Sequence, residues 1–212
     1  MPGTPDVWID VRQEREALLA LLESLAPAEW EEPSLCTEWR VRDVVGHMVS
    51  ETMMTILKVM QGLVTSGLRI NRFIAIDARR QGSVPIAELV AGFRDAVPSR
   101  AHLPGLSSIS MLEDIVVHSL DIRRPLLHER AVPEARMILV AADLLANRFF
   151  LGHKLFRGLQ VRAIDADWSA GEGPEVTGPI EGLVLAMSGR LVGLDELHGE
   201  GMSAVYERAS LR

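Results

Sequence analysis

Two histidines lie inside segments with helical apolar periodicity, and each has a carboxylate one helical turn away. His47 has Asp43 four residues before it and Glu51 four residues after it, and His118 has Asp114 four residues before it. Side chains four residues apart lie on one face of a helix. Such a carboxylate and imidazole can bind one metal ion, and a third ligand from a facing helix would leave one position open for water or substrate. The pattern is typical of a catalytic zinc site.

The same spacing has a second interpretation. A histidine on a half-apolar helix is often a hydrogen-bonded core residue. His118 shares its stripe with Met111 and Ile115, so it should point inward. Glu51 and Asp121, each taken alone, can be solvated or helix-end charges. Spacing alone therefore leaves both a metal site and a structural role open.

The single cysteine, Cys36, is a candidate nucleophile, but a lone thiol in a loop is usually a small apolar filler. Trp30 and Trp39, which flank it, are expected to be core anchors rather than a ligand-stacking pair. One cysteine makes no intramolecular disulfide, and the first residues have neither the basic start nor the apolar stretch of a signal peptide. We therefore expect a reducing, cytoplasmic location.

Composition excludes several classes of protein. The 212 residues are 48% hydrophobic and carry 22 basic and 29 acidic side chains, a net charge of −7. A nucleic-acid-binding protein needs a basic face to displace counterions, so we expect no nucleic-acid partner. The most apolar long stretch, residues 137–151, is interrupted by polar residues and is too short to span a bilayer, so we expect no membrane partner.

Apolar periodicity predicts helices over most of the chain, at about residues 11–25, 40–66, 70–82, 86–97, 109–124 and 134–150. Beyond residue 152 the pattern changes to a short strand at 159–164, a turn at 170–174 and a second strand, which together predict a hairpin, followed by a short helix from Pro179. The expected fold is α+β and mainly α, with a helical bundle over 1–152 and a small α/β module over 153–212.

Three ordered motifs resemble those of one known family. The first, from Trp30 to Met48, contains a Trp, a Pro followed by Ser, a Cys, a second Trp, a Val-Arg-Asp and a helix-borne His. The second surrounds His118, with an acid four residues before it and an Asp three residues after it, and the third spans residues 171–190. Over nearly its whole length the chain resembles the mycothiol-dependent maleylpyruvate isomerase-like proteins of the DinB-like metalloprotein superfamily.

The resemblance implies a DinB-like four-helix bundle that binds a divalent metal ion, usually zinc. Carried over residue by residue, the ligands are His47, Asp114 and His118. The isomerase itself has Glu at the position of Asp114, and because Asp is shorter by a methylene, Glu113 and Glu51 are the alternative carboxylate ligands.

The function that the resemblance implies is isomerisation of, or S-transfer onto, a small electrophilic substrate with the help of mycothiol or a similar thiol. The metal would lower the pKa of the bound thiol. Glu51 would move protons or support a ligand, and Arg190 would bind an anionic group of the substrate or cofactor, with a plain salt bridge as its alternative role. A competing interpretation is a non-catalytic ligand-binding or dimerising scaffold, and a homodimer is left open.

Overall fold

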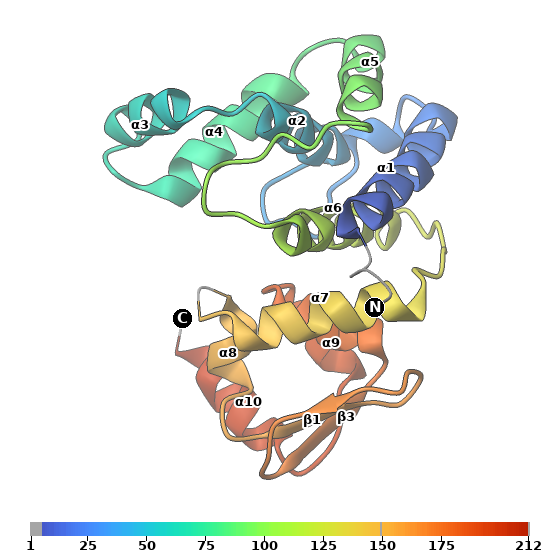
Figure 1. Cartoon of the computed structure of the whole chain (residues 1–212), viewed down its shortest axis with the longest axis vertical. Helices are drawn as coiled ribbons and strands as arrows, with labels where there is room; N and C mark the ends of the chain where they lie inside the picture. The colour runs from blue at the N-terminus through green and yellow to red at the C-terminus, as the bar shows by residue number, and fades with distance from the viewer. Residues whose placement is uncertain (1–5, 149, 212) are drawn as a thin grey trace. The chain divides into compact units, whose positions relative to one another are not determined.

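The structure is a computed structural model that describes residues 6–148 and 150–211 (Figure 1). Its chain divides into two compact units, Met1–Arg130 and Ala131–Arg212. The sequence analysis placed the domain boundary later, after residue 152. The difference concerns the helix at 134–146, which packs on helices of the second unit and groups with them.

Among the described residues of the first unit, the regular elements are all helices (Figure 1). Its longest helices begin at side-chain caps, because Asp6 accepts a hydrogen bond from the N–H of Trp8 and Ser107 accepts one from the N–H of Ser110. The elements are α1 (Val7–Ser24), the 3₁₀ helix η1 (Glu29–Glu31), α2 (Val41–Thr52), α3 (Ile56–Thr65), α4 (Ile70–Gly82), α5 (Ile86–Ala96) and α6 (Ser108–Arg123).

Helix α6 forms the centre of this unit. Most of its side chains are buried, and it packs against both α1 and α2. The face of α2 that the sequence predicted to be apolar is buried as well, with Val41, Val44, Val45 and Met48 in the core. These two helices carry the two histidines that the sequence analysis singled out.

The single helix predicted over residues 40–66 is wrong. The structure divides it into α2 and α3, with a non-helical connection at Met53–Thr55. Thr55 starts the second helix, because its side chain accepts a hydrogen bond from the N–H of Lys58, and the Lys58 ammonium group donates to the carbonyl of Met53. The capping threonine thus starts a new helix at a point where apolar periodicity alone predicts one continuous helix.

Helix α4 crosses α2 closely because both helices have a glycine at the crossing. A Cβ atom on Gly46 would lie 2.5 Å from the backbone nitrogen of Gly82. No larger side chain fits there without moving one helix. This contact fixes the position of the α2 backbone at Gly46, directly before His47.

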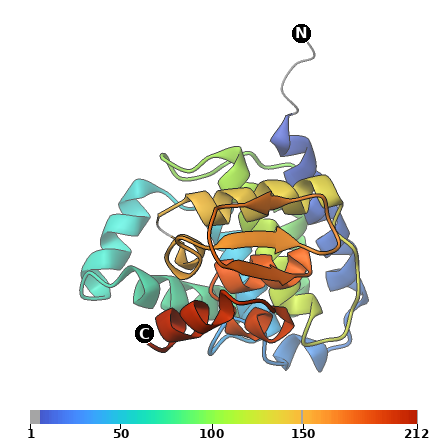
Figure 2. The ribbon, with the colours of Figure 1, turned by 90° about the horizontal axis from the view of Figure 1, so that it is seen from below.

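The second unit joins helices to a small sheet (Figure 2). The strand order is β2–β1–β3, with β1 antiparallel to β2 and parallel to β3, so the predicted hairpin between the strands on either side of the 170–174 turn is wrong. The elements are α7 (Glu134–Ala146), α8 (Leu151–Leu155), β1 (Gln160–Ala163), β2 (Ser169–Ala170), β3 (Glu175–Gly178), α9 (Ile180–Met187), the 3₁₀ helix η2 (Leu191–Glu196) and α10 (Met202–Ser210).

The predicted fold class is confirmed: the protein is mainly α with a small sheet in its C-terminal part. Within the described residues, none of the helices is both long enough and apolar enough to cross a membrane.

Candidate metal centre

The facing helices α2 and α6 bring His47, Asp114 and His118 together. Asp114 Oδ1 lies 3.3 Å from His118 Nε2 and 3.9 Å from His47 Nε2. The two imidazole rings are nearly perpendicular, with centroids 5.1 Å apart. A nitrogen or oxygen atom of each residue lies within 4.8 Å of the other two. Two imidazoles and one carboxylate therefore converge on one point.

This spacing fits a single divalent ion. Ligand atoms about 2.0–2.2 Å from a tetrahedral ion lie about 3.3–3.6 Å from one another. The distance between Asp114 and His118 is within that range, and the distance between Asp114 and His47 exceeds it by a few tenths of an ångström. Three protein ligands leave one position open, as in catalytic zinc sites.

Asp121 orients His118 through Nδ1, the ring nitrogen that does not face Asp114. Its Oδ2 atom is 2.8 Å from His118 Nδ1, and the Asp121 side chain is fully buried. A hydrogen bond at Nδ1 leaves Nε2, the atom that faces Asp114, as the ring nitrogen that could bind a metal ion. Metal-ligating histidines are commonly held in this way by a carboxylate.

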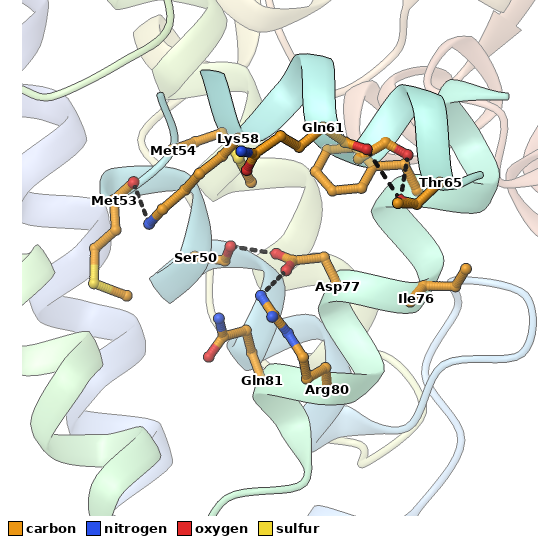
Figure 3. A pocket seen from close by; sticks show the side chains of 12 residues that line it. Ser50, Met53, Met54, Lys58, Gln61, Thr65, Ile76, Asp77, Arg80 and Gln81 are labelled. Carbon is orange, nitrogen blue, oxygen red and sulfur yellow. Dashed lines mark hydrogen bonds and ion pairs between the residues drawn. The ribbon is translucent and has the colours of Figure 1, made fainter. Parts of the chain in front are cut away.

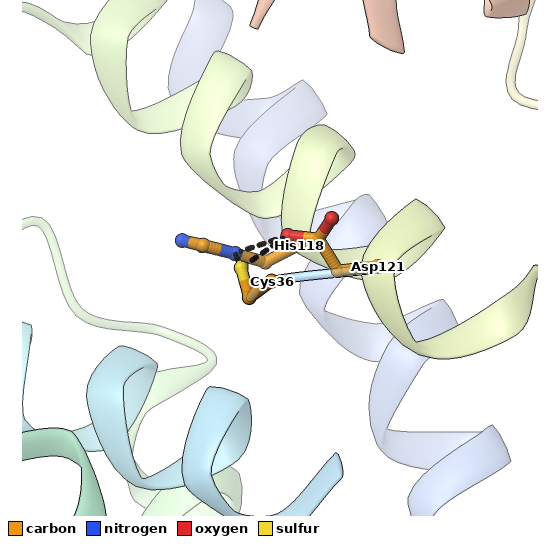
Figure 4. A group of neighbouring side chains, drawn as sticks. All are labelled: Cys36, His118 and Asp121. Atoms are coloured by element: carbon orange, nitrogen blue, oxygen red, sulfur yellow. Dashed lines mark hydrogen bonds and ion pairs between the residues drawn. The ribbon is translucent and has the colours of Figure 1, made fainter. Parts of the chain in front are cut away.

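Cys36 shares the same carboxylate oxygen (Figure 4). Its thiol donates to Asp121 Oδ2 over 3.0 Å, and the sulfur is 3.9 Å from His118 Nδ1. Cys36, His118 and Asp121 form a second group whose atoms are close enough to hold a metal ion. The expectation of a plain loop filler is therefore wrong, since the thiol contacts the support of a candidate ligand.

Burial and charge act in opposite directions on the two residues of α6. Burial alone would lower the pKa of His118, but the nearby charge of Asp114 and the hydrogen bonds of Asp114 and Asp121 raise it well above its usual value. Burial alone would raise the pKa of Asp114, but the charge and hydrogen bond of His118 lower it below its usual value. Without metal, this pair is an imidazolium and a carboxylate.

Glu51 lies one turn after His47 on α2, beside Asp114 of α6. Burial, the charge of Asp114 and a hydrogen bond with Asp114 raise the pKa of Glu51 well above its usual value. This shift favours the protonated form of the Glu51 carboxyl group beside the Asp114 carboxylate. Of the carboxylates weighed from the sequence, Asp114 is the one grouped with both histidines, while Glu113 is buried elsewhere on α6.

A buried cation, Arg15 of α1, faces these carboxylates. Its guanidinium group donates to the carbonyls of Ala96 and Ser99 over 3.0 Å and 2.7 Å. Burial lowers the pKa of Arg15, and the charges of Asp114 and Glu51 oppose that shift. The sequence analysis missed Arg15, because it lies about a hundred residues from Asp114 and no local motif marks it.

Trp39 covers the two histidines. Its ring centroid is 5.3 Å from that of His47 and 6.3 Å from that of His118, and it is nearly parallel to the latter ring. The loop that carries it is closed by hydrogen bonds from Ser34 to the carbonyl of Trp39 and from the N–H of Trp39 to Cys36. One short loop thus places a thiol behind His118 and an indole over both imidazoles, so Trp39 is not the plain core anchor expected from the sequence.

Arg190 lies in the second unit, directly before η2, and its guanidinium group donates to the carbonyl of Ser188 over 2.8 Å. The assignment of Arg190 to substrate or cofactor binding stays a prediction.

A cavity of about 400 Å³ lies elsewhere in the first unit, between the end of α2 and helices α3 and α4 (Figure 3). In its wall, Asp77 accepts hydrogen bonds from Ser50 and Arg80. Neither His47 nor His118 lines this cavity, so it is separate from the candidate metal centre.

Comparison with known proteins agrees with the fold and with the first of the three motifs. Residues 11–104 match the family described as the mycothiol maleylpyruvate isomerase N-terminal domain. Two crystal structures of the mycothiol-dependent maleylpyruvate isomerase, one of them of a histidine-to-alanine mutant, resemble this chain with a TM-score of 0.63 and 15% sequence identity, covering 92% of this chain and 92% of each solved chain. A comparison with curated proteins gave no match. Residues 11–104 of the first unit therefore match the N-terminal domain of that family, and the chain shares the fold of the solved isomerase.

Proposed function

We propose that the first unit binds one divalent metal ion through His47, Asp114 and His118, and that the protein uses a low-molecular-weight thiol to isomerise, or transfer sulfur to, a small electrophile. The observation that carries the proposal is the convergence of two imidazoles and a carboxylate at the spacing of one tetrahedral ion, with His118 oriented by a buried carboxylate. Two histidines and one carboxylate are also the protein ligands of known catalytic zinc sites, so zinc is the proposed ion.

A bound divalent ion supplies a Lewis-acidic position at which a thiol is held as its thiolate at neutral pH. The surrounding residues prepare that position. Asp121 fixes the tautomer of His118, and Trp39 covers the imidazole faces and limits the access of water. Glu51 holds a proton beside Asp114, where it can be passed to a substrate carbon or oxygen.

The thiol and the substrate are proposed from the relatives. The similar solved structures are of a mycothiol-dependent maleylpyruvate isomerase, so mycothiol or a related thiol is the proposed cofactor and a conjugated carboxylate is the proposed class of electrophile. Arg190 is the proposed partner of an anionic group on either molecule. Such thiols are kept reduced in the cytoplasm, which is the proposed location.

Metal analysis of the purified protein tests the metal site. The expected result is about one equivalent of zinc in the parent protein, lost in His47→Ala and His118→Ala and retained in His102→Ala, which removes an exposed histidine. Glu51→Gln should keep its metal and Asp114→Asn should lose it. A parent protein that stays metal-free after incubation with zinc would overturn the site.

A thiol-adduct assay tests the reaction separately. Zinc-loaded protein, mycothiol and an unsaturated dicarboxylate should give isomer or thioether faster than the metal-free protein does, and Glu51→Gln should slow this reaction while keeping its zinc. A protein that binds zinc stoichiometrically but never accelerates the reaction would leave the scaffold interpretation in place.

A further inference from the structure

Helix α3 has an outer face that is apolar and exposed. Ile56, Leu57, Met60 and Val64 lie on this face, and each is between 56% and 70% exposed. Met53, before the helix, is also exposed, but it lines the cavity between α2, α3 and α4. A helix that is apolar on its outer as well as its inner side is normally buried on both. The stripe is larger than the scattered single apolar residues expected on a monomer.

The inner face of α3 is already occupied, so the stripe is not a misplaced core surface. Gly62 lies against the ring of Phe73 of α4, and a Cβ atom at Gly62 would be 2.2 Å from that ring. Val59 and Leu63 are half-buried on the same inner side. The cavity shown in Figure 3 also lies on this inner side, since Gly62 and Phe73 line it. Among the described residues of the first unit, no element covers the outer face.

We propose that the outer face of α3 is the contact between two copies of this chain. At 100° per residue, Ile56, Met60 and Val64 form one row, with Met60 in the middle. In an antiparallel pair of α3 helices related by a two-fold axis at Met60, each Met60 meets its copy and each Ile56 meets Val64 of the other copy. The row is therefore complementary to itself, as an isologous interface requires.

The area of the surface agrees with this occupant. The exposed fractions of Ile56, Leu57, Met60 and Val64, with Leu68 after the end of the helix, amount to on the order of 600 Å² per copy, about three quarters of the roughly 800 Å² that a standard interface buries on each partner. None of these side chains is charged, so their burial leaves no unpaired ion.

Charge distinguishes this occupant from a lipid surface. Lys58 is the only charged residue of α3, and it lies about 160° around the helix from Met60, outside the stripe. Residues 52–76 contain three cations and no acid, which would suit anionic lipid, but the net charge of −7 of the whole chain repels such a surface. A second copy needs no anionic partner at the stripe itself.

Sedimentation equilibrium tests the interface. The parent protein should be dimeric at micromolar concentration, and Met60→Glu should weaken the dimer by at least about a hundredfold, because it places two carboxylates on the two-fold axis. Ile9→Glu is the matched control, since Ile9 is also helical and has the same 56% exposure as Met60. A monomeric parent, or a dimer unchanged by Met60→Glu, would overturn the proposal.

Cross-linking tests the two-fold arrangement itself. In a Cys36→Ser background, Met60→Cys should give a disulfide-linked dimer with diamide, whereas Lys58→Cys, on the other side of the helix, should not. Equal cross-linking of the two variants would contradict the antiparallel pair. A parent protein that is monomeric and instead binds phosphatidylglycerol vesicles, with Met60→Glu abolishing that binding, would assign the face to lipid and overturn the dimer.

Discussion

Replacing Asp121 by Asn should weaken metal binding although Asp121 does not face the proposed ion. The Asp121 carboxylate accepts the Nδ1–H of His118 over 2.8 Å in a fully buried setting. Asn keeps the shape and one acceptor but removes the negative charge that makes the opposite ring nitrogen a better donor. Loss of such support typically costs 10–100-fold in metal affinity. This corresponds to about 1.4–2.7 kcal/mol of binding free energy.

The assay is competition for zinc against a chromophoric chelator at pH 7.5, with Asp95→Asn as the control on an exposed helical acid. Because Asp121 is buried, the thermal unfolding of each metal-free variant must be measured as well, to separate a lost ligand orientation from a lost fold. Asp121→Asn with an intact fold and the zinc affinity of the parent protein would refute the account of how His118 is oriented.

Cys36 allows a second step in the same experiment. Its thiol donates to the same carboxylate oxygen, so Cys36→Ala should change zinc affinity by only a few-fold, since a thiol is a weak donor. The two substitutions should be strongly non-additive, because both act through the one oxygen of Asp121. A full additive loss in the double variant would indicate that the thiol contacts the ion directly.

Three further predictions follow from the same geometry. Addition of Cu²⁺ should quench the fluorescence of Trp39, whose ring centroid lies 5.3 Å from that of His47. Trp39→Phe, which keeps the other three tryptophans, should lose the metal-dependent part of the quenching. Quenching that survives in Trp39→Phe would contradict the placement of the indole. Because the pKa of His118 is raised, the metal-free protein carries an imidazolium at pH 7, so zinc binding should release about one proton and zinc affinity should fall as the pH is lowered. Calorimetry in buffers of different ionisation enthalpy measures this release. A binding enthalpy that does not depend on the buffer would contradict it. Gly46→Ala should destabilise the protein by about 1–3 kcal/mol, because the added Cβ atom would lie 2.5 Å from the backbone of α4, and a melting temperature equal to that of the parent protein would contradict this packing.

The residues of the candidate centre could be predicted from the sequence where they lie close together on one helix. Asp114 and His118 are four residues apart on one helix, so their common face could be deduced from helical geometry alone. His47 required the additional expectation that a second helix faces the first. Periodicity supplied both helices, and the family motif supplied the pairing between them.

Other contacts of the centre depend on loop geometry and long-range packing. Cys36 and Trp39 reach the histidines through the closure of one loop by backbone hydrogen bonds, and Arg15 arrives from the first helix. No sequence spacing encodes these contacts. Asp43 has a suitable spacing, four residues before His47, but its carboxylate is used elsewhere. It accepts hydrogen bonds from the N–H and the guanidinium group of Arg40 at the start of α2.

The sheet was mispredicted for a related reason. A strand, a turn and a strand read along the chain suggest a hairpin, but Ser169 and Ala170, at the start of the predicted turn, pair with β1 themselves. The next strand therefore takes the opposite edge of β1 and runs parallel to it. Short strands carry too few residues for alternation to show which edge each one takes.

The measurement that tests the central claim most directly is X-ray absorption at the zinc edge, on zinc-loaded protein kept reduced with a phosphine rather than a thiol. The account predicts two imidazole nitrogens, light oxygen scatterers and no sulfur, as His47, Asp114 and His118 would provide. A sulfur neighbour at about 2.3 Å would contradict it, because the ion would then sit with Cys36 and Asp121 on the other side of His118.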